Sequence, residues 1–147
     1  MMDFAPFQTT QVAAVFDRWE PAIRLPLLQL RQHILDVAAQ TGGVGPLAET
    51  LKWGEPAWLP ATPGTGTTLR INRLKRSRTG YALFVPCQTG LIQTFAQHYP
   101  GTFAFQGNRA ILLDAGTAID VLPLRHCIAL ALTCHRRKAT AAARADR

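Results

Sequence analysis

The segment LRINRLKRSRTGYALFV, residues 69–85, decides the class of fold. Over residues 69–72 apolar and polar side chains alternate, and this period of two predicts a strand that is buried on one side and wet on the other. Residues 81–85 form a continuous apolar run, which predicts a strand that is covered on both faces. The basic and polar residues 72–80 predict the connection between these two strands.

The N-terminal part of the chain predicts two helices and a short helical piece. Apolar side chains recur at the spacing of one helical face after Thr9 or Thr10, either of which is a plausible N-cap. The same spacing continues through residues 27–38, and this second helix should begin close to Pro26, because proline is tolerated only near a helix start. A proline at the first turn predicts the short helical piece, residues 46–51.

The C-terminal half predicts a helix, a hairpin and a last helix. Residues 88–99 have helical spacing that ends at a Pro-Gly pair. Two apolar runs predict a hairpin over residues 103–113, because the glycine and asparagine between them can adopt positive φ. The last helix should open near Pro123 and run to His135.

This order of elements favours an α+β fold, a two-layer sandwich in which helices pack on one face of a mostly antiparallel sheet. The chain has 147 residues, about the length of one domain. We expect a single domain over residues 1–138 and a basic, Ala/Arg-rich tail over residues 139–147.

Composition indicates a globular protein of the reducing cytoplasm. Hydrophobic residues make up 48% of the chain and charged residues 17%. The N-terminus lacks the features of a secretory signal, and no apolar run reaches the roughly 18 residues of a membrane span, so no membrane partner is expected. Cys87, Cys127 and Cys134 are an odd number without CxxC spacing, which predicts reduced thiols.

The net charge of +7 is concentrated in two short segments. One is residues 70–78 and the other is residues 136–147, while the rest of the chain is slightly acidic. Because lysine and arginine release counterions from phosphate, these segments suggest a weak nucleic-acid binder. No aromatic residue interleaves the first segment to stack on bases, so a solvated loop is favoured and nucleic acid is not the expected partner.

The sequence contains no motif that identifies an enzyme. The nine carboxylates are dispersed, and GxSxG, HExxH, P-loop and GxGxxG patterns are absent from the sequence. Cys87 is a candidate nucleophile, because it lies where the helix 88–99 should begin and a helix N-terminus favours the thiolate. The favoured alternative is a small buried residue. The glycine-rich segment 63–68 precedes a strand rather than a helix, which favours a flexible turn over a phosphate loop.

Metal handling is a second hypothesis, with His98, His126, Cys134, His135 and scattered carboxylates as ligands. Cys127 and Cys134 are seven residues apart, so on one helix they lie about 10 Å apart along the axis. One zinc ion with Zn–S bonds of about 2.3 Å cannot join them. Core packing is favoured for these residues, and we assign neither a metal site nor a cofactor from the sequence.

The segment KWGEPAW, residues 52–58, is the strongest candidate for a binding site. It places two indoles, a lysine and a carboxylate within seven residues around a turn that cannot be a continuous helix. An aromatic wall with a nearby cation suits a ligand pocket. In the equally weighted alternative, the tryptophans close the edge of the core and Lys52 pairs with Glu55.

The favoured hypothesis is a binding domain without enzymatic activity. The cations of that segment, of the strand 69–72 and of the hairpin turn favour a small anionic ligand. The site then comprises Lys52, Trp53, Glu55, Trp58, Arg70 and Arg109.

An ordered series of segments resembles the YdhG-like family of bacterial domains of unknown function. The segments are ETLKWGEPAW (49–58), GTTLRI (66–71), CQT (87–89) with Thr94-Phe95, GNRAI (107–111) and ALALTCH (129–135). The similarity covers roughly residues 20–138, although many relatives have tyrosine at the position of Cys134.

The resemblance implies a compact two-layer α/β fold and a cytoplasmic bacterial protein, and it implies no reaction. Some members of the wider family resemble frataxin and have been proposed as iron chaperones. Frataxin-type iron binding relies on acidic surface residues, whereas this chain has 9 Asp and Glu against 16 Lys and Arg.

Overall fold

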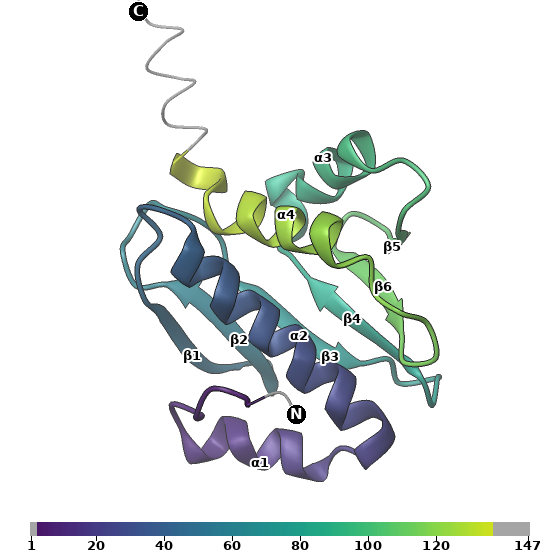
Figure 1. The fold of residues 1–147 in the computed structure, drawn as a ribbon. Coiled ribbons are helices and arrows are strands. Elements are labelled where there is room, and N and C mark those ends of the chain that lie inside the picture. Colours follow the sequence, from purple (N-terminus) through teal and green to yellow (C-terminus); the bar gives the residue numbers. More distant parts are fainter. Residues whose placement is uncertain (1–2, 137–147) are drawn as a thin grey trace, which may run out of the picture.

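The computed structural model describes residues 3–136, in which six antiparallel strands form one sheet in the order β1-β2-β3-β4-β6-β5. Helices α1, α2 and α4 lie against one face of this sheet (Figure 1). The predicted α+β class, with helices on one face of an antiparallel sheet, is therefore confirmed. The strands are β1 Leu47–Lys52, β2 Glu55–Pro60, β3 Leu69–Arg73, β4 Gly80–Phe84, β5 Ala104–Gln106 and β6 Ala110–Asp114.

The helices are α1 Thr10–Arg18, α2 Pro21–Gln40, α3 Leu91–His98 and α4 Val121–Leu132, with a 3₁₀ turn over Cys87–Thr89. The N-terminus of α1 matches the sequence expectation, since the Thr9 hydroxyl accepts a hydrogen bond from the Val12 N–H. The predicted tail, residues 139–147, lies outside the described residues. No helix in the described part of the chain is both long and apolar enough to cross a membrane.

Helix α2 begins five residues before Pro26, so the predicted start close to that proline was wrong. The reason is a contact between helices: the Arg24 guanidinium donates hydrogen bonds to the carbonyls of Phe16, Asp17 and Trp19 at the end of α1. The last carbonyls of a helix lack i+4 partners, although that of Phe16 also accepts from the Trp19 N–H at 3.2 Å, and the Arg24 bonds hold the chain reversal that starts α2 early. Pro26 then costs one backbone hydrogen bond inside a helix of 20 residues.

The segment 46–51 was predicted to be helical and instead forms β1. This strand pairs with β2 through a hairpin whose closing pair is Lys52 and Glu55. The two turn residues, Trp53 and Gly54, have φ of 55° and 78°. Positive φ at both positions is the conformation that matches the twist of a two-residue hairpin. Pairing with β2 therefore overrode the local helix signal of the proline.

The main core lies between the sheet and the helices. Alternate residues of β3, β4 and β6, including Ile71, Leu83 and Ile111, pack with apolar residues of α2 and α4. A second and smaller apolar cluster lies on the opposite face of the sheet. It consists of Ala82, Phe84 and Ala110, with Leu74 and Leu112 packed against it.

The glycine-rich loop before β3 packs against the C-terminal end of α4. The Thr67 N–H donates to the Ala131 carbonyl at 3.0 Å, and the Arg136 N–H donates to the Thr65 carbonyl at 3.0 Å. A Cβ atom on Gly66 would lie 2.1 Å from the Leu132 carbonyl oxygen. The segment that was expected to be a flexible turn is thus held in place by backbone contacts.

Candidate functional site

The candidate site lies on the face of the sheet opposite α1, α2 and α4. Register pairs Ala57 with Arg70, Arg70 with Phe84, and Phe84 with Ala110, so these four residues form a row across four strands. Ile71 belongs to the main core, and its neighbour Arg70 must point to the other face. An arginine and a phenylalanine are therefore cross-strand neighbours on the open face.

A cavity of about 560 Å³, here called the basic cavity, opens over this row. Five cations, one carboxylate and two amides line it, with apolar residues beneath. Its lining residues are Arg70, Arg73, Lys75, Arg76, Arg109, Glu55, Asn72, Gln106, Leu74, Ser77, Phe84 and Leu112.

Two guanidinium groups lie over the ring of Phe84. The Arg70 guanidinium carbon is 5.4 Å from the centre of the Phe84 ring, and that of Arg109 is 6.0 Å from it. Both distances are within the range of cation–π attraction, so the ring helps to hold both cations over the floor of the cavity.

Glu55 offsets one of these two charges. Its carboxylate accepts a hydrogen bond from Arg70 at 2.5 Å and another from the Asn72 amide at 2.9 Å. Within residues 3–136, Arg109, Lys75 and Arg76 have no carboxylate at ion-pair distance. The cavity therefore keeps an excess of positive charge.

The β3–β4 connection, residues 74–79, holds two of the cations over the cavity. Its backbone is closed by hydrogen bonds from Leu74 N–H to the Gly80 carbonyl at 2.9 Å and from Gly80 N–H to the Ser77 hydroxyl at 2.8 Å. Leu74 packs on the apolar cluster of the open face. These contacts anchor the connection, and Lys75 and Arg76 at its tip line the cavity while remaining exposed to solvent.

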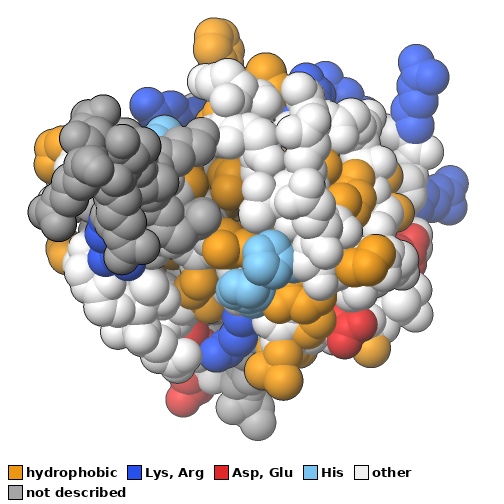
Figure 2. Space-filling model, turned by 90° about the horizontal axis from the view of Figure 1, so that it is seen from above, with side chains coloured by type: hydrophobic (Ala, Val, Ile, Leu, Met, Phe, Trp, Pro, Cys, Tyr) orange, Lys and Arg blue, Asp and Glu red, His pale blue; other side chains and the backbone are white. Residues whose placement is uncertain are grey.

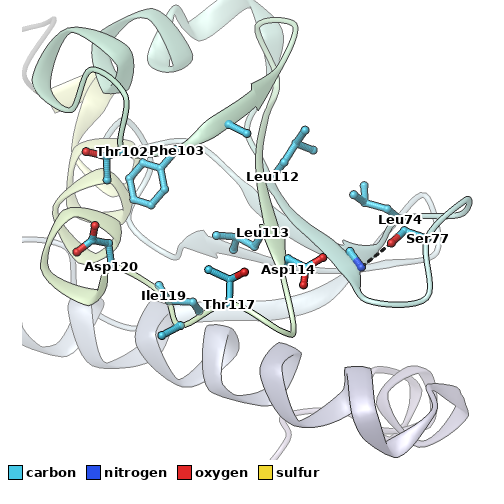
Figure 3. Close-up of a pocket in the computed structure, with 13 residues that line it drawn as sticks. Leu74, Ser77, Thr102, Phe103, Leu112, Leu113, Asp114, Thr117, Ile119 and Asp120 are labelled. Atoms are coloured by element: carbon cyan, nitrogen blue, oxygen red, sulfur yellow. Dashed lines mark hydrogen bonds between the residues drawn. The ribbon is translucent and has the colours of Figure 1, made fainter.

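A second cavity of about 500 Å³, here called the adjoining cavity, continues from the basic cavity and shares Leu74, Ser77 and Leu112 with it. It contains two carboxylates, Asp114 and Asp120. Figure 3 shows Asp120 at the end of this cavity opposite Leu74 and Ser77. Asp114 accepts hydrogen bonds from the Thr79 hydroxyl at 2.9 Å and from the Gly116 N–H at 2.8 Å. The groove over the open face is thus basic at one end and acidic at the other.

The structure brings together three of the six site residues expected from the sequence: Glu55, Arg70 and Arg109. Lys52 and Trp53 lie at the tip of the β1–β2 hairpin, where Trp53 is 91% exposed, and they do not line the basic cavity. Although Lys52 and Glu55 are register partners in the hairpin, their side chains form no ion pair, and the Glu55 carboxylate is held by Arg70 and Asn72.

Trp58 lies on the helix side of the sheet, where it is fully enclosed. Its indole N–H donates to a Glu49 carboxylate oxygen at 2.8 Å. That carboxylate also accepts from the buried guanidinium of Arg31 at 2.7 Å. The two tryptophans of the segment 52–58 therefore have unrelated environments, one in solvent and one in the core.

Lys75 and Arg76 are exposed loop residues, as expected from the sequence, and together with Arg73 at the end of β3 they also line the cavity. The period of two in residues 69–72 was a signal for Arg70 and Asn72, because both had to lie on the face opposite Ile71. No comparable signal existed for the connection, whose path depends on the packing of Leu74.

Cys87 does not have the environment that was predicted for it. It lies in the three-residue 3₁₀ turn, and Gly90 separates that turn from α3. The Cys87 thiol is exposed, so it is neither at an α-helix N-terminus nor a small buried residue. Cys127 and Cys134 are buried and form no disulfide, and burial raises the pKa of Cys127 to about 12.

Two of the histidines in the metal hypothesis are neighbours. The rings of His98 and His126 are 5.1 Å apart, and the Tyr99 hydroxyl lies 2.5 Å from Nδ1 of His126. Figure 2, which views the end of the molecule that carries α3 and α4, shows adjacent histidine side chains among hydrophobic ones. Cys134 is buried. In the described part of the chain, no three His, Cys, Asp or Glu residues are placed to share a metal ion.

The sequence matches no protein-family model and no curated protein. Among solved structures, it is similar to YdhG of Bacillus subtilis, a protein of the DUF1801 family, with a TM-score of 0.56 over 83% of this chain and 89% of YdhG. The chain has the fold of YdhG. Because sequence identity to YdhG is 14%, the similarity establishes the architecture alone. It confirms the YdhG-like fold.

Proposed function

We propose that this chain is a binding domain, without enzymatic activity, for a small anionic ligand held in the basic cavity. The observation that carries the proposal is the pair of guanidinium groups, from Arg70 and Arg109, that both approach the ring of Phe84. Four cations that lack a carboxylate partner among the described residues, Arg73, Lys75, Arg76 and Arg109, line the same cavity.

The chemistry of these groups favours an oxyanion. A guanidinium is planar and offers several N–H donors, so it binds carboxylate or phosphate oxygens through paired hydrogen bonds. The volume of about 560 Å³ suits a small molecule rather than a macromolecule. The apolar floor of Phe84 and Leu112 would accept a flat or aliphatic part of the ligand next to the charged group.

Two further features support a binding role and its location. The described lining residues of the basic cavity include neither histidine nor cysteine, the side chains that most often act as acid, base or nucleophile near neutral pH. Cys87, Cys127 and Cys134 form no disulfide, so we place this role in the reducing cytoplasm.

Isothermal titration calorimetry against phosphate, citrate, benzoate and adenosine monophosphate tests the proposal. At least one anion should bind saturably, and Arg109→Ala should weaken its binding about tenfold or more through loss of a charge-assisted hydrogen bond. Arg18→Ala is the matched control, because Arg18 is an exposed arginine of α1. Equal affinity of wild type and Arg109→Ala would remove the assignment.

The same titration with a 20-base-pair DNA duplex separates the nucleic-acid alternative. Binding through phosphate contacts weakens steeply as salt rises, roughly in proportion to the number of contacts. At 150 mM salt we expect the protein to bind the small anion more tightly than the duplex. Tighter binding of the duplex, with a steep salt dependence, would favour the alternative.

A further inference from the structure

A third cavity, on the helix side of the sheet, has no role in the proposed anion site. It encloses about 490 Å³ between α2, β4 and the β6–α4 connection. The residues Thr117, Ala118 and Ile119 of that connection line both this cavity and the adjoining cavity, so they form the wall between the two. None of its lining residues within 3–136 is an Asp, Glu, Lys or Arg. They are Pro26, Gln29, His33, Tyr81, Ala115, Gly116, Thr117, Ala118, Ile119 and Val121.

Tyr81 is one of the residues that line this cavity. The residue is 1% exposed, and its hydroxyl forms no hydrogen bond within residues 3–136. Every fully enclosed side-chain nitrogen or oxygen of the described residues does have a partner. The hydroxyl must therefore be the accessible atom of an otherwise buried side chain. Burial, aided by the negative charge of Asp114, raises the pKa of Tyr81 to about 12, so the hydroxyl keeps its proton.

His33 offers a second donor to the same cavity. Its Nδ1 accepts a hydrogen bond from Nε of Arg125 at 3.1 Å, and Arg125 is itself held by Asp36 at 3.3 Å. An Nδ1 that accepts a hydrogen bond carries no proton, so the neutral ring carries its proton on Nε2. Burial and the charge of Arg125 lower the pKa of His33 against the opposing effect of Asp36, which keeps the ring neutral at pH 7.

We propose that this cavity binds a small uncharged molecule through a carbonyl oxygen, which accepts hydrogen bonds from the Tyr81 hydroxyl and the His33 Nε2–H. Pro26, Ile119 and Val121 supply apolar walls for the rest of the ligand. An uncharged ligand is favoured because no cation lines the cavity and the guanidinium of Arg125 is already paired with Asp36. An anion there would lose its hydration without gaining a counter-charge.

Nuclear magnetic resonance titration of the full chain with isobutyramide, 2-pyrrolidone and cyclopentanone tests this site. Saturable shifts are expected at the backbone amides of residues 116–119 and at the side-chain amide of Gln29. Tyr81→Phe should weaken probe binding about five- to tenfold, because it removes one hydrogen bond and keeps the ring. Tyr99→Phe is the matched control, since the Tyr99 hydroxyl contacts His126 instead of this cavity.

Three results would overturn the inference: no saturable shift at residues 116–119 with any of the three probes, equal affinity of Tyr81→Phe and wild type, or tighter binding of isobutyrate than of isobutyramide. Thermal melts of both tyrosine variants confirm that they fold. Arg109→Ala should leave isobutyramide binding unchanged, since Arg109 lies on the other face of the sheet. The Arg109→Ala measurement therefore tests this cavity separately from the proposed anion site.

Discussion

The guanidinium of Arg31 and the carboxylate of Glu49 form an ion pair inside the core, with Nε 2.7 Å from Oε2 and side chains that are 1% and 0% exposed. The indole of Trp58 and the backbone N–H of Gln8 donate to the same carboxylate, at 2.8 and 2.9 Å. Arg31 also donates to the carbonyls of Ala5 and Pro6. One buried network therefore links the N-terminal segment, α2, β1 and β2.

Removal of one charge from this pair should be strongly destabilising. Glu49→Gln leaves the Arg31 cation buried without a counter-charge, and we expect the free energy of unfolding to fall by about 3 to 5 kcal/mol. Urea denaturation followed by circular dichroism measures this loss. The double variant Arg31→Met/Glu49→Leu removes both charges and should lose less than Glu49→Gln alone. A larger loss in the double variant would show that the pair itself, rather than charge balance, holds the network.

The same carboxylate predicts how stability depends on pH. Burial by itself raises the pKa of Glu49, but hydrogen bonds from Arg31, Gln8 and Trp58 outweigh it and hold that pKa below its ordinary value of 4.5. The unfolded chain then binds this proton more readily than the folded chain does. Glu49 therefore stabilises the fold above about pH 4.5, and this contribution is lost as pH falls through the folded-state pKa.

Urea titrations of wild type and Glu49→Gln at pH 7, 5, 4 and 3 check this dependence. The difference in stability between the two proteins should shrink as the pH falls below 5. If the two curves stayed parallel over this range, Glu49 would not be the group responsible.

The loop that precedes β3 packs against α4, and this contact predicts a strict requirement for glycine at position 66. In Gly66→Ala the new Cβ would lie 2.1 Å from the carbonyl oxygen and 2.2 Å from the carbonyl carbon of Leu132. Both atoms are backbone, so they cannot move without shifting α4 or the loop, and we expect a loss of about 2 to 3 kcal/mol.

Gly42→Ala is the control, because no atom lies within 4 Å of its Cβ position and its φ is not positive. Thermal unfolding of the two variants should show a lower melting temperature for Gly66→Ala and little change for Gly42→Ala. Equal melting temperatures would mean that the loop does not pack on α4 as described.

Glu55 should limit the affinity of the basic cavity for anions. Its carboxylate occupies Arg70, so Glu55→Gln would free that guanidinium while keeping an acceptor for the Asn72 amide. We expect anion affinity to rise about three- to tenfold, measured by calorimetry with the anion that binds the wild type. Glu20→Gln, an exposed site at the start of α2, should leave it unchanged. Weaker binding by Glu55→Gln would mean that Glu55 positions Arg70 for the ligand.

The parts of the fold that depend on local pattern were predictable. Alternation over residues 69–72, the apolar run 81–85 and the Gly-Asn turn of the last hairpin each describe neighbours along the chain, and all three form the expected strands. The segment 46–51 was mistaken for a helix, because the local proline signal says nothing about a pairing strand. That strand also depends on a carboxylate whose partner, Arg31, is 18 residues away.

The sequence by itself determined the α+β class, the positions of most elements and the side of β3 on which Arg70 would lie, because side-chain direction follows from the period of a strand. Only the tertiary structure decided which side chains from distant segments lie close together. Arg70 and Arg109 both approach Phe84 because β4 lies between β3 and β6, and Trp58 contacts Glu49 because β2 pairs with β1. Such contacts depend on strand order and on the packing of distant segments, which the pattern of neighbouring residues does not contain.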